Sequence, residues 1–208
     1  MRFNQRSSAR HPGGGRLQIG IGGRLGSEQV ADFKSESVAD LRRNPQLTQC
    51  GKLTDLTVEH FLEVSNIMLP VNAQLRKIRV SYVAPSTISQ IPFFPGLSNI
   101  WIQGYELPAD ELDLSNVSEL ETLVISIPKQ IRLRLPVSLK NLTIFGSARV
   151  SITNAANLVN MRNLSLRDLG ALDHSDEVLT LPALSHVMLD DKTREAIGRI
   201  PSQWAKKQ

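Results

Sequence analysis

The sequence has few of the residues that build disulfide, metal or catalytic sites. Among its 208 residues there is one cysteine, Cys50, so an intramolecular disulfide is impossible and a reducing compartment, such as a cytoplasm, is expected. The histidines at positions 11, 60, 174 and 186 have no metal-ligand spacing among themselves or with Cys50. A glycine-rich run at residues 20–26 lacks the Lys-Ser/Thr ending of a phosphate loop. We therefore expect no metal and no cofactor.

Long hydrophobic runs and early acidic residues are missing as well. No apolar run approaches the roughly 18 residues of a membrane span, and the start lacks the apolar stretch of a secretory signal peptide. The first 26 residues hold five arginines, seven glycines and no acid. Outside them the charges nearly balance, at 19 basic against 20 acidic residues, so the net charge of +4 belongs to this segment.

Residues 1–26 are too poor in large apolar side chains to order by themselves, so we predict a flexible tail. Three functions stay open for it: an arginine-rich nucleic-acid arm, a mitochondrial-type presequence, or an unstructured secretion signal. From Ser27 the pattern changes to that of an amphipathic helix, which Ser27 can cap and Pro45 ends. Residues 27–45 are therefore predicted to cap the domain that follows.

The dominant feature is an aliphatic pattern, L-x-x-L-x-L, that recurs seven times at intervals of 19 to 23 residues. All 21 of its positions are aliphatic: Leu53/Leu56/Val58, Leu75/Ile78/Val80, Leu97/Ile100/Ile102, Leu120/Leu123/Ile125, Leu139/Leu142/Ile144, Met161/Leu164/Leu166 and Leu184/Val187/Leu189. A fixed period of this length indicates stacked units, each with one short strand.

This pattern resembles the leucine-rich repeat family over residues 46–190. The resemblance implies an α/β solenoid, a horseshoe of about seven units with a parallel β-sheet on its concave face and helical caps. The family's Asn, eight residues after each first Leu, is absent; those positions hold Phe61, Val83, Tyr105, Pro128, Ser147, Leu169 and Lys192. A right-handed parallel β-helix stays open as the alternative. The segments that return between units carry alternating pairs of their own, namely Leu112/Leu114, Ile131/Leu133/Leu135 and Val150/Ile152.

Leu-Pro or Phe-Pro pairs precede several units, at residues 69–70, 94–95, 135–136 and 181–182. Proline disfavours helix in the residue before it, so these return segments are predicted to be extended or turn-like. Thin repeats marked in this way are similar to those of bacterial type III secretion effectors, a resemblance that implies action inside a host cell. Residues 191–208 are predicted to form a C-terminal cap, whose helix begins at Asp190-Asp191 and buries Ile197, Ile200 and Trp204.

No catalytic constellation is recognisable. Asp173, His174 and Ser175 are consecutive, and adjacent residues cannot converge on one reacting atom. The positions equivalent to Cys50 in the other units are largely apolar, which predicts a buried structural thiol. We therefore expect a protein that is not an enzyme.

The outward face of the strands is the remaining candidate surface. Side chains alternate along a strand, so the residues between the aliphatic positions point away from the core. Most are small or polar, and the larger ones form a predicted binding surface of Arg79, Trp101, Gln103, Val124, Thr143, Phe145, Arg167 and Met188. The competing interpretation is that Trp101 folds onto its neighbours only to shield the sheet.

The sequence therefore favours a non-catalytic module that binds a partner protein on its concave face, such as a host protein bound by a secreted effector. Two alternatives remain. The arginine-rich tail could serve a nucleic-acid-binding protein. A β-helix groove could serve an enzyme that acts on polysaccharides, although such grooves usually need clustered carboxylates, which the outward positions lack.

Overall fold

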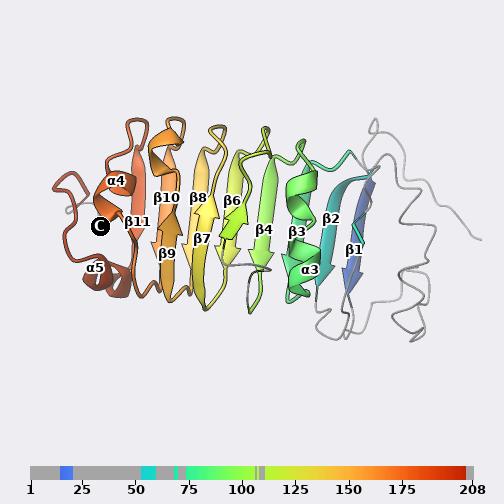
Figure 1. Cartoon of the computed structure of the whole chain (residues 1–208), viewed down its shortest axis with the longest axis horizontal. Helices are drawn as coiled ribbons and strands as arrows, with labels where there is room; N and C mark the ends of the chain where they lie inside the picture. The colour runs from blue at the N-terminus through green and yellow to red at the C-terminus, as the bar shows by residue number, and fades with distance from the viewer. Residues whose placement is uncertain are drawn as a thin grey trace, which may run out of the picture.

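The fold is dominated by one mostly parallel β-sheet. The computed structural model describes residues 15–20, 53–59, 68–69, 74–105, 107 and 111–204. Eight strands stand side by side in the order β1-β2-β3-β4-β6-β8-β10-β11, and every neighbouring pair is parallel (Figure 1). Their bounds are Gly15–Gly20, Leu53–Glu59, Lys77–Ser81, Asn99–Gln103, Thr122–Ser126, Asn141–Phe145, Asn163–Arg167 and His186–Leu189.

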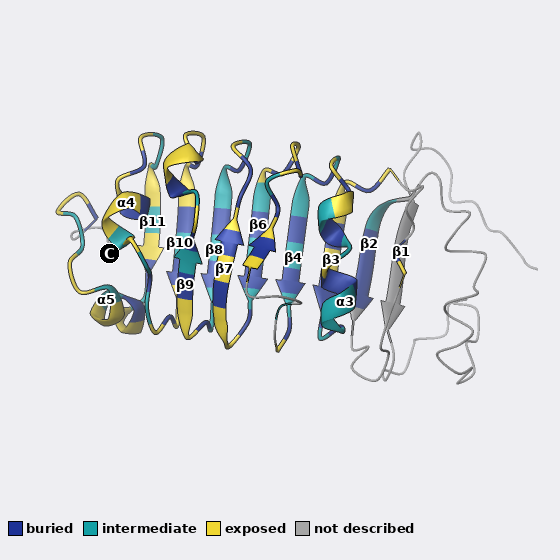
Figure 2. Cartoon of the chain, viewed as in Figure 1, coloured by how far each residue is buried: buried dark blue, intermediate teal, exposed yellow. Residues whose placement is uncertain are grey.

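The recurring aliphatic residues set the register of this sheet. The second position of every unit pairs with the second position of the next, from Leu56 through Ile78 and Ile100 onward, and the third positions pair likewise. Because side chains alternate, both columns face the core, and the central strands show bands of buried and half-buried residues (Figure 2). A slip by one residue would turn each column toward solvent, so the pattern specifies a single register.

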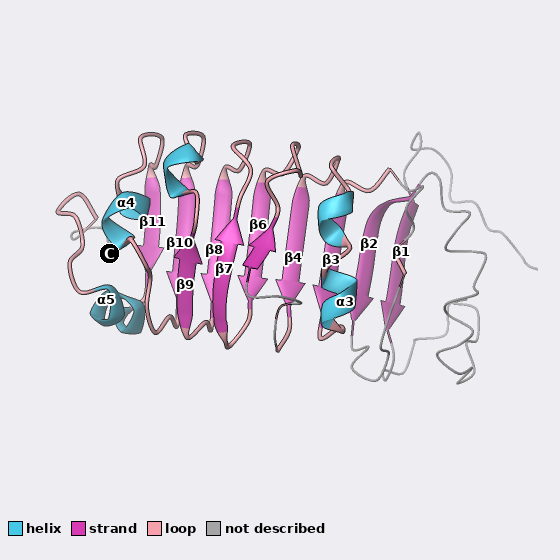
Figure 3. Ribbon diagram, in the orientation of Figure 1, coloured by secondary structure: helices cyan, strands magenta, loops and turns pink. Residues whose placement is uncertain are grey.

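The return segments build a second parallel sheet, β5-β7-β9 (Figure 3). Its strands span Glu111–Asp113, Gln130–Arg134 and Arg149–Ile152, and they contain the alternating pairs that favoured the β-helix alternative. Leu112, Leu133 and Ile152 point into the same hydrophobic core as the first sheet. The prediction that these segments are extended is therefore confirmed for three units.

Helices are few and short in the described residues. They are α3 (Pro85–Ile88), α4 (Ser175–Leu179), α5 (Asp191–Ile197) and the two 3-10 turns η1 (Ile91–Phe93) and η2 (Ala155–Asn157). α3 and α4 lie in return segments where an extended or turn-like chain was predicted, which corrects that prediction for two units. Buried Ile88 and Val178 show that a single helical turn can fill the core where a strand does so in the middle units.

In three units the chain leaves its strand through a left-handed residue, one position before the place where leucine-rich repeats carry asparagine. Tyr82, Gly146 and Asp168 have φ angles of 53°, 74° and 55°, and each stands seven residues after the first aliphatic position of its unit. One position later, where leucine-rich repeats carry asparagine, the hydroxyl of the buried Ser147 donates to the Ile127 carbonyl at 2.7 Å. An asparagine amide would make the same kind of hydrogen bond to the backbone. The bend therefore depends on backbone conformation rather than on an asparagine ladder.

Residues 15–20 differ from the predicted flexible tail, and the rest of residues 1–26 lies outside the described residues. Gly15–Gly20 forms strand β1 and pairs in parallel with β2, and the register places Leu17 opposite Leu56 and Ile19 opposite Val58. The predicted capping helix at residues 27–45 and Cys50 lie outside the described residues.

The C-terminal end follows the predicted helix and shortens it. Helix α5 begins after Asp190, whose Oδ1 accepts from the Thr193 backbone N–H at 2.9 Å, and it ends at Gly198 with φ 74°. Trp204 is buried and donates its indole N–H to the Leu179 carbonyl at 2.8 Å. The C-terminal residues therefore tie α5 and the final turn to α4.

Asp190 should make the stability of this end depend on pH. A hydrogen bond from the Thr193 side chain is the main reason that its pKa lies below the ordinary value, and the backbone N–H groups of Thr193 and Asp168 act in the same direction. The unfolded chain then takes up a proton first as pH falls, so this stabilisation is complete above about pH 4 and disappears as pH falls through the lower folded pKa. Asp190→Asn keeps an N-cap acceptor but cannot titrate. Its melting temperature should fall less steeply than that of the wild type below about pH 4, and parallel curves would contradict this assignment.

Candidate binding surface

The outward residues of the sheet form three parallel rows. The register aligns a middle row of Thr57, Arg79, Trp101, Val124, Thr143, Ser165 and Met188. The predicted neighbours Arg79, Trp101, Val124 and Thr143 are thus consecutive across four strands. Neighbouring strands in a sheet lie about 4.7–4.9 Å apart, so these four side chains share one continuous strip.

Arg79 and Trp101 form the centre of this strip on β3 and β4. The Arg79 guanidinium carbon lies 4.4 Å from the centroid of the Trp101 ring, a cation–π arrangement. Arg79 is exposed and Trp101 half-buried, while the indole Nε1 is fully enclosed and makes no hydrogen bond within the described structure. Trp101 therefore has a half-exposed ring with Arg79 lying over it, and an enclosed donor without a hydrogen bond.

Tyr82 and Tyr105 extend this centre, although neither belongs to the predicted binding surface. Gln103 Nε2 donates to the Tyr82 hydroxyl at 2.8 Å, and the two tyrosine rings lie 5.4 Å apart at a tilt of 47°. Tyr105 is 55% exposed. Tyr82 follows β3 directly and Tyr105 lies two residues past the end of β4, so an aromatic residue close to the strand end was the available signal.

The remaining predicted residues gather in a second group. Phe145 pairs in register with Arg167, and the Arg167 guanidinium contacts the sulfur of Met188, which is 54% exposed. Val124 and Thr143 lie between this group and the Arg79–Trp101 pair. The eight predicted residues therefore share one face but do not converge on one point.

The face between the two groups is polar and nearly uncharged. The twelve outward positions of β4, β6, β8 and β10 carry one charge, that of Arg167. Along one row, Asn163 donates to Asn141, and Asn141 donates to the Thr122 hydroxyl at 3.1 Å. This ladder holds the amides in fixed positions, so the surface offers ordered donors and acceptors without a strong electric field.

Asp173, His174 and Ser175, which are consecutive in the sequence, lie at the start of a return helix. Asp173 is engaged by Arg149, with Nη2 and Oδ1 2.7 Å apart, and this contact holds the pKa of the carboxyl below its usual range. His174 and Ser175 follow Asp173 in a turn and at the start of α4. Across the described ranges, no group of three or more Asp, Glu, His or Cys side chains could hold a metal ion.

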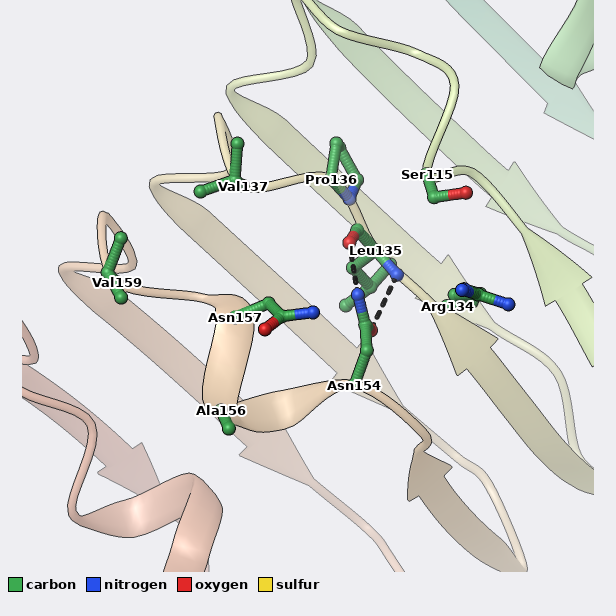
Figure 4. A pocket seen from close by; sticks show the side chains of 9 residues that line it. All are labelled: Ser115, Arg134, Leu135, Pro136, Val137, Asn154, Ala156, Asn157 and Val159. Carbon is green, nitrogen blue, oxygen red and sulfur yellow. Dashed lines mark hydrogen bonds between the residues drawn. The ribbon is translucent and has the colours of Figure 1, made fainter.

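A shallow hollow of about 450 Å³ lies among the return segments (Figure 4). Val137 and Val159 stand at its rim, and the Asn154 side chain bonds both backbone groups of Leu135, accepting at 3.0 Å and donating at 2.7 Å. Asn154 thus takes the place of a strand neighbour for Leu135. The contacts of Asn154 give the hollow a structural role. Arg134 is the one charged residue among those that line it.

In the parts of the chain that the structure describes, no helix has the length and apolar character needed to cross a bilayer. Comparisons of the chain with protein-family models, with curated proteins and with solved structures found no match.

Proposed function

We propose that this chain is a non-catalytic module that binds a partner protein on the outward face of its eight-stranded sheet. The observation that carries the proposal is the strip from Arg79 to Thr143, where a stacked Arg–Trp pair lies beside a flat, ordered and uncharged polar surface. Trp, Tyr and Arg are the residue types most often found at the centres of protein interfaces. Their grouping with Tyr82 and Tyr105 supplies such a centre.

The scaffold of the proposed module is a leucine-rich-repeat-like solenoid of about seven units with a helical C-terminal cap. The in-register columns of the first sheet support this fold, because each strand repeats the same aliphatic positions as its neighbour. Three consecutive units return through strands β5, β7 and β9, and the units on either side return through α3 or α4, as irregular repeats would. The second sheet supports the β-helix alternative only over β5, β7 and β9.

The resemblance to secreted bacterial effectors makes host proteins the first class of partner to test. The test uses the full chain as bait in a host-cell lysate, followed by calorimetry with each protein that it captures. Trp101→Ala should weaken the affinity by about 2 kcal/mol or more, since the substitution removes the centre of the interface. Its melting temperature should stay close to that of the wild type because the indole is half-exposed.

Phe93→Ala is the matched control. Phe93 is an aromatic residue that is 77% exposed, and it belongs to η1 in a return segment rather than to the sheet face. This variant should bind like the wild type. If Trp101→Ala instead lowers stability and leaves the affinity of the captured protein unchanged, Trp101 only shields the sheet and the proposed site is wrong.

A further inference from the structure

Two enclosed hydrogen-bond donors lie next to each other on β3 and β4. The Ser81 hydroxyl and the Trp101 indole N–H have no hydrogen-bond partner within the described structure, and Ser81 is only 4% exposed. Ser81 pairs in register with Gln103, which follows Trp101 by two residues on the same face. The two donors are therefore diagonal neighbours, a separation that aromatic side chains span. An enclosed donor without an acceptor is costly and rare, so a pair of them calls for a reason.

The chemistry around the pair favours an anionic acceptor. A hydroxyl and an indole N–H both donate, and the Arg79 guanidinium lies over the indole with further N–H groups in a planar fork. Lys77, the preceding outward residue on β3, is paired with a carboxylate, with its Nζ 3.6 Å from Asp55 Oδ1. A carboxylate has two oxygens and accepts several hydrogen bonds at once, so a single group can satisfy both enclosed donors.

We infer that Ser81, Trp101 and Arg79 form the seat for an acidic side chain, Asp or Glu, of the bound protein. This inference rests on the proposed function, because it names the chemistry of the partner at the same strip. Arg79 covers the ring but is exposed, so its side chain can leave the indole and follow the incoming carboxylate. The unbound protein then keeps two unsatisfied donors, and the partner supplies their acceptor.

The first test concerns stability. Ser81→Ala and Trp101→Phe each remove one donor and keep most of the side-chain volume. If the donors have no acceptor in the unbound protein, both variants of the full chain should melt at or above the wild-type temperature. A lower melting temperature for both means that internal groups or bound water already satisfy the donors, and that result overturns the inference.

The second test follows the indole N–H directly by nuclear magnetic resonance. The chain has two tryptophans, and the Trp204 N–H already donates to the Leu179 carbonyl, so its signal is an internal reference. Trp101→Phe assigns the two signals. The probes are N-acetyl-aspartate N-methylamide, its asparagine counterpart and inorganic phosphate, each at constant ionic strength. The aspartate probe should move the Trp101 signal downfield in a saturable way, and the Trp204 signal should stay in place.

Ser81→Ala should weaken the response to the aspartate probe about tenfold, as expected for the loss of one hydrogen bond to a charged group. An equal response to the asparagine probe, or a response to phosphate alone, overturns the acidic-side-chain assignment. The two proposals also fail separately. If Trp101→Ala weakens a captured partner while no aspartate response exists, only this inference is wrong. If the aspartate response exists while the captured partner binds the Trp101→Ala variant as tightly as the wild type, the proposed function is wrong.

Discussion

Leu123→Ala should lower the free energy of unfolding by about 2–5 kcal/mol. Leu123 is fully buried in β6, and in the register it lies between Ile100 and Leu142 in the continuous core column. Truncation leaves a cavity that neighbours on both strands cannot close, because each is held by its own register. A domain of this kind has roughly 5–15 kcal/mol of net stability, so one substitution removes a large share of it. Urea titration monitored by circular dichroism measures the change.

Thr122→Ala is the control within the same strand. Thr122 points outward and accepts a hydrogen bond from Asn141 Nδ2, whose amide can turn to water when the hydroxyl is gone. The change should stay within about 0.5 kcal/mol. If Thr122→Ala were the more damaging of the two, the inward and outward faces of the sheet would be assigned the wrong way round.

The register could be predicted because one physical requirement fixes it. Each unit repeats two aliphatic positions two residues apart, and only one alignment buries both on every strand. The spacing alone therefore predicts that Ile78, Ile100 and Leu123 are neighbours, and the register of the sheet confirms it. The middle row of outward residues followed from the same alignment, which explains why Arg79 and Trp101 were expected side by side.

The bends and returns could not be predicted in the same way. A left-handed conformation at Tyr82 or Asp168 has no strong signature in those residue types, unlike glycine at position 146. The return segments carry short aliphatic pairs that suit a strand or one helical turn equally well, so tertiary packing decides between β7 and α4. The β1 strand was missed for a similar reason, since its two aliphatic residues lie in a glycine-rich context.

The details of the candidate site depend on side-chain rotamers rather than on spacing. The sequence places Ser81 on the outward face as a small polar residue, which predicts exposure, yet it is enclosed by its surroundings. Whether Trp101 hides its N–H or presents it depends on which way the ring turns beneath Arg79. The enclosed donors therefore became evident only from the three-dimensional arrangement.

Removing one whole unit should preserve folding, whereas removing part of a unit should not. Deletion of residues 97–119 joins Gly96 to Leu120, so β6 takes the place of β4 beside β3 with the same register positions. It removes β4 and β5, and β5 is an edge strand of the second sheet, so the β7–β9 pairing is kept. In a stacked architecture, stability is roughly a sum of unit and nearest-neighbour terms. This variant should therefore unfold in a single cooperative transition at a lower denaturant concentration.

Deletion of residues 110–119, inside the same unit, is the comparison. It removes fewer residues but takes the buried side chains of Leu112, Leu114 and Val117 out of the core while β4 and β6 both remain. The shortened return must still span the two strands, and it brings no apolar side chains to fill the space behind them. We expect it to lose cooperative unfolding altogether, in the urea dependence of both circular dichroism and tryptophan fluorescence. Equal loss of cooperativity in the two variants would show that the 23-residue segment 97–119 is not a unit of folding, and the repeat architecture would have to be abandoned.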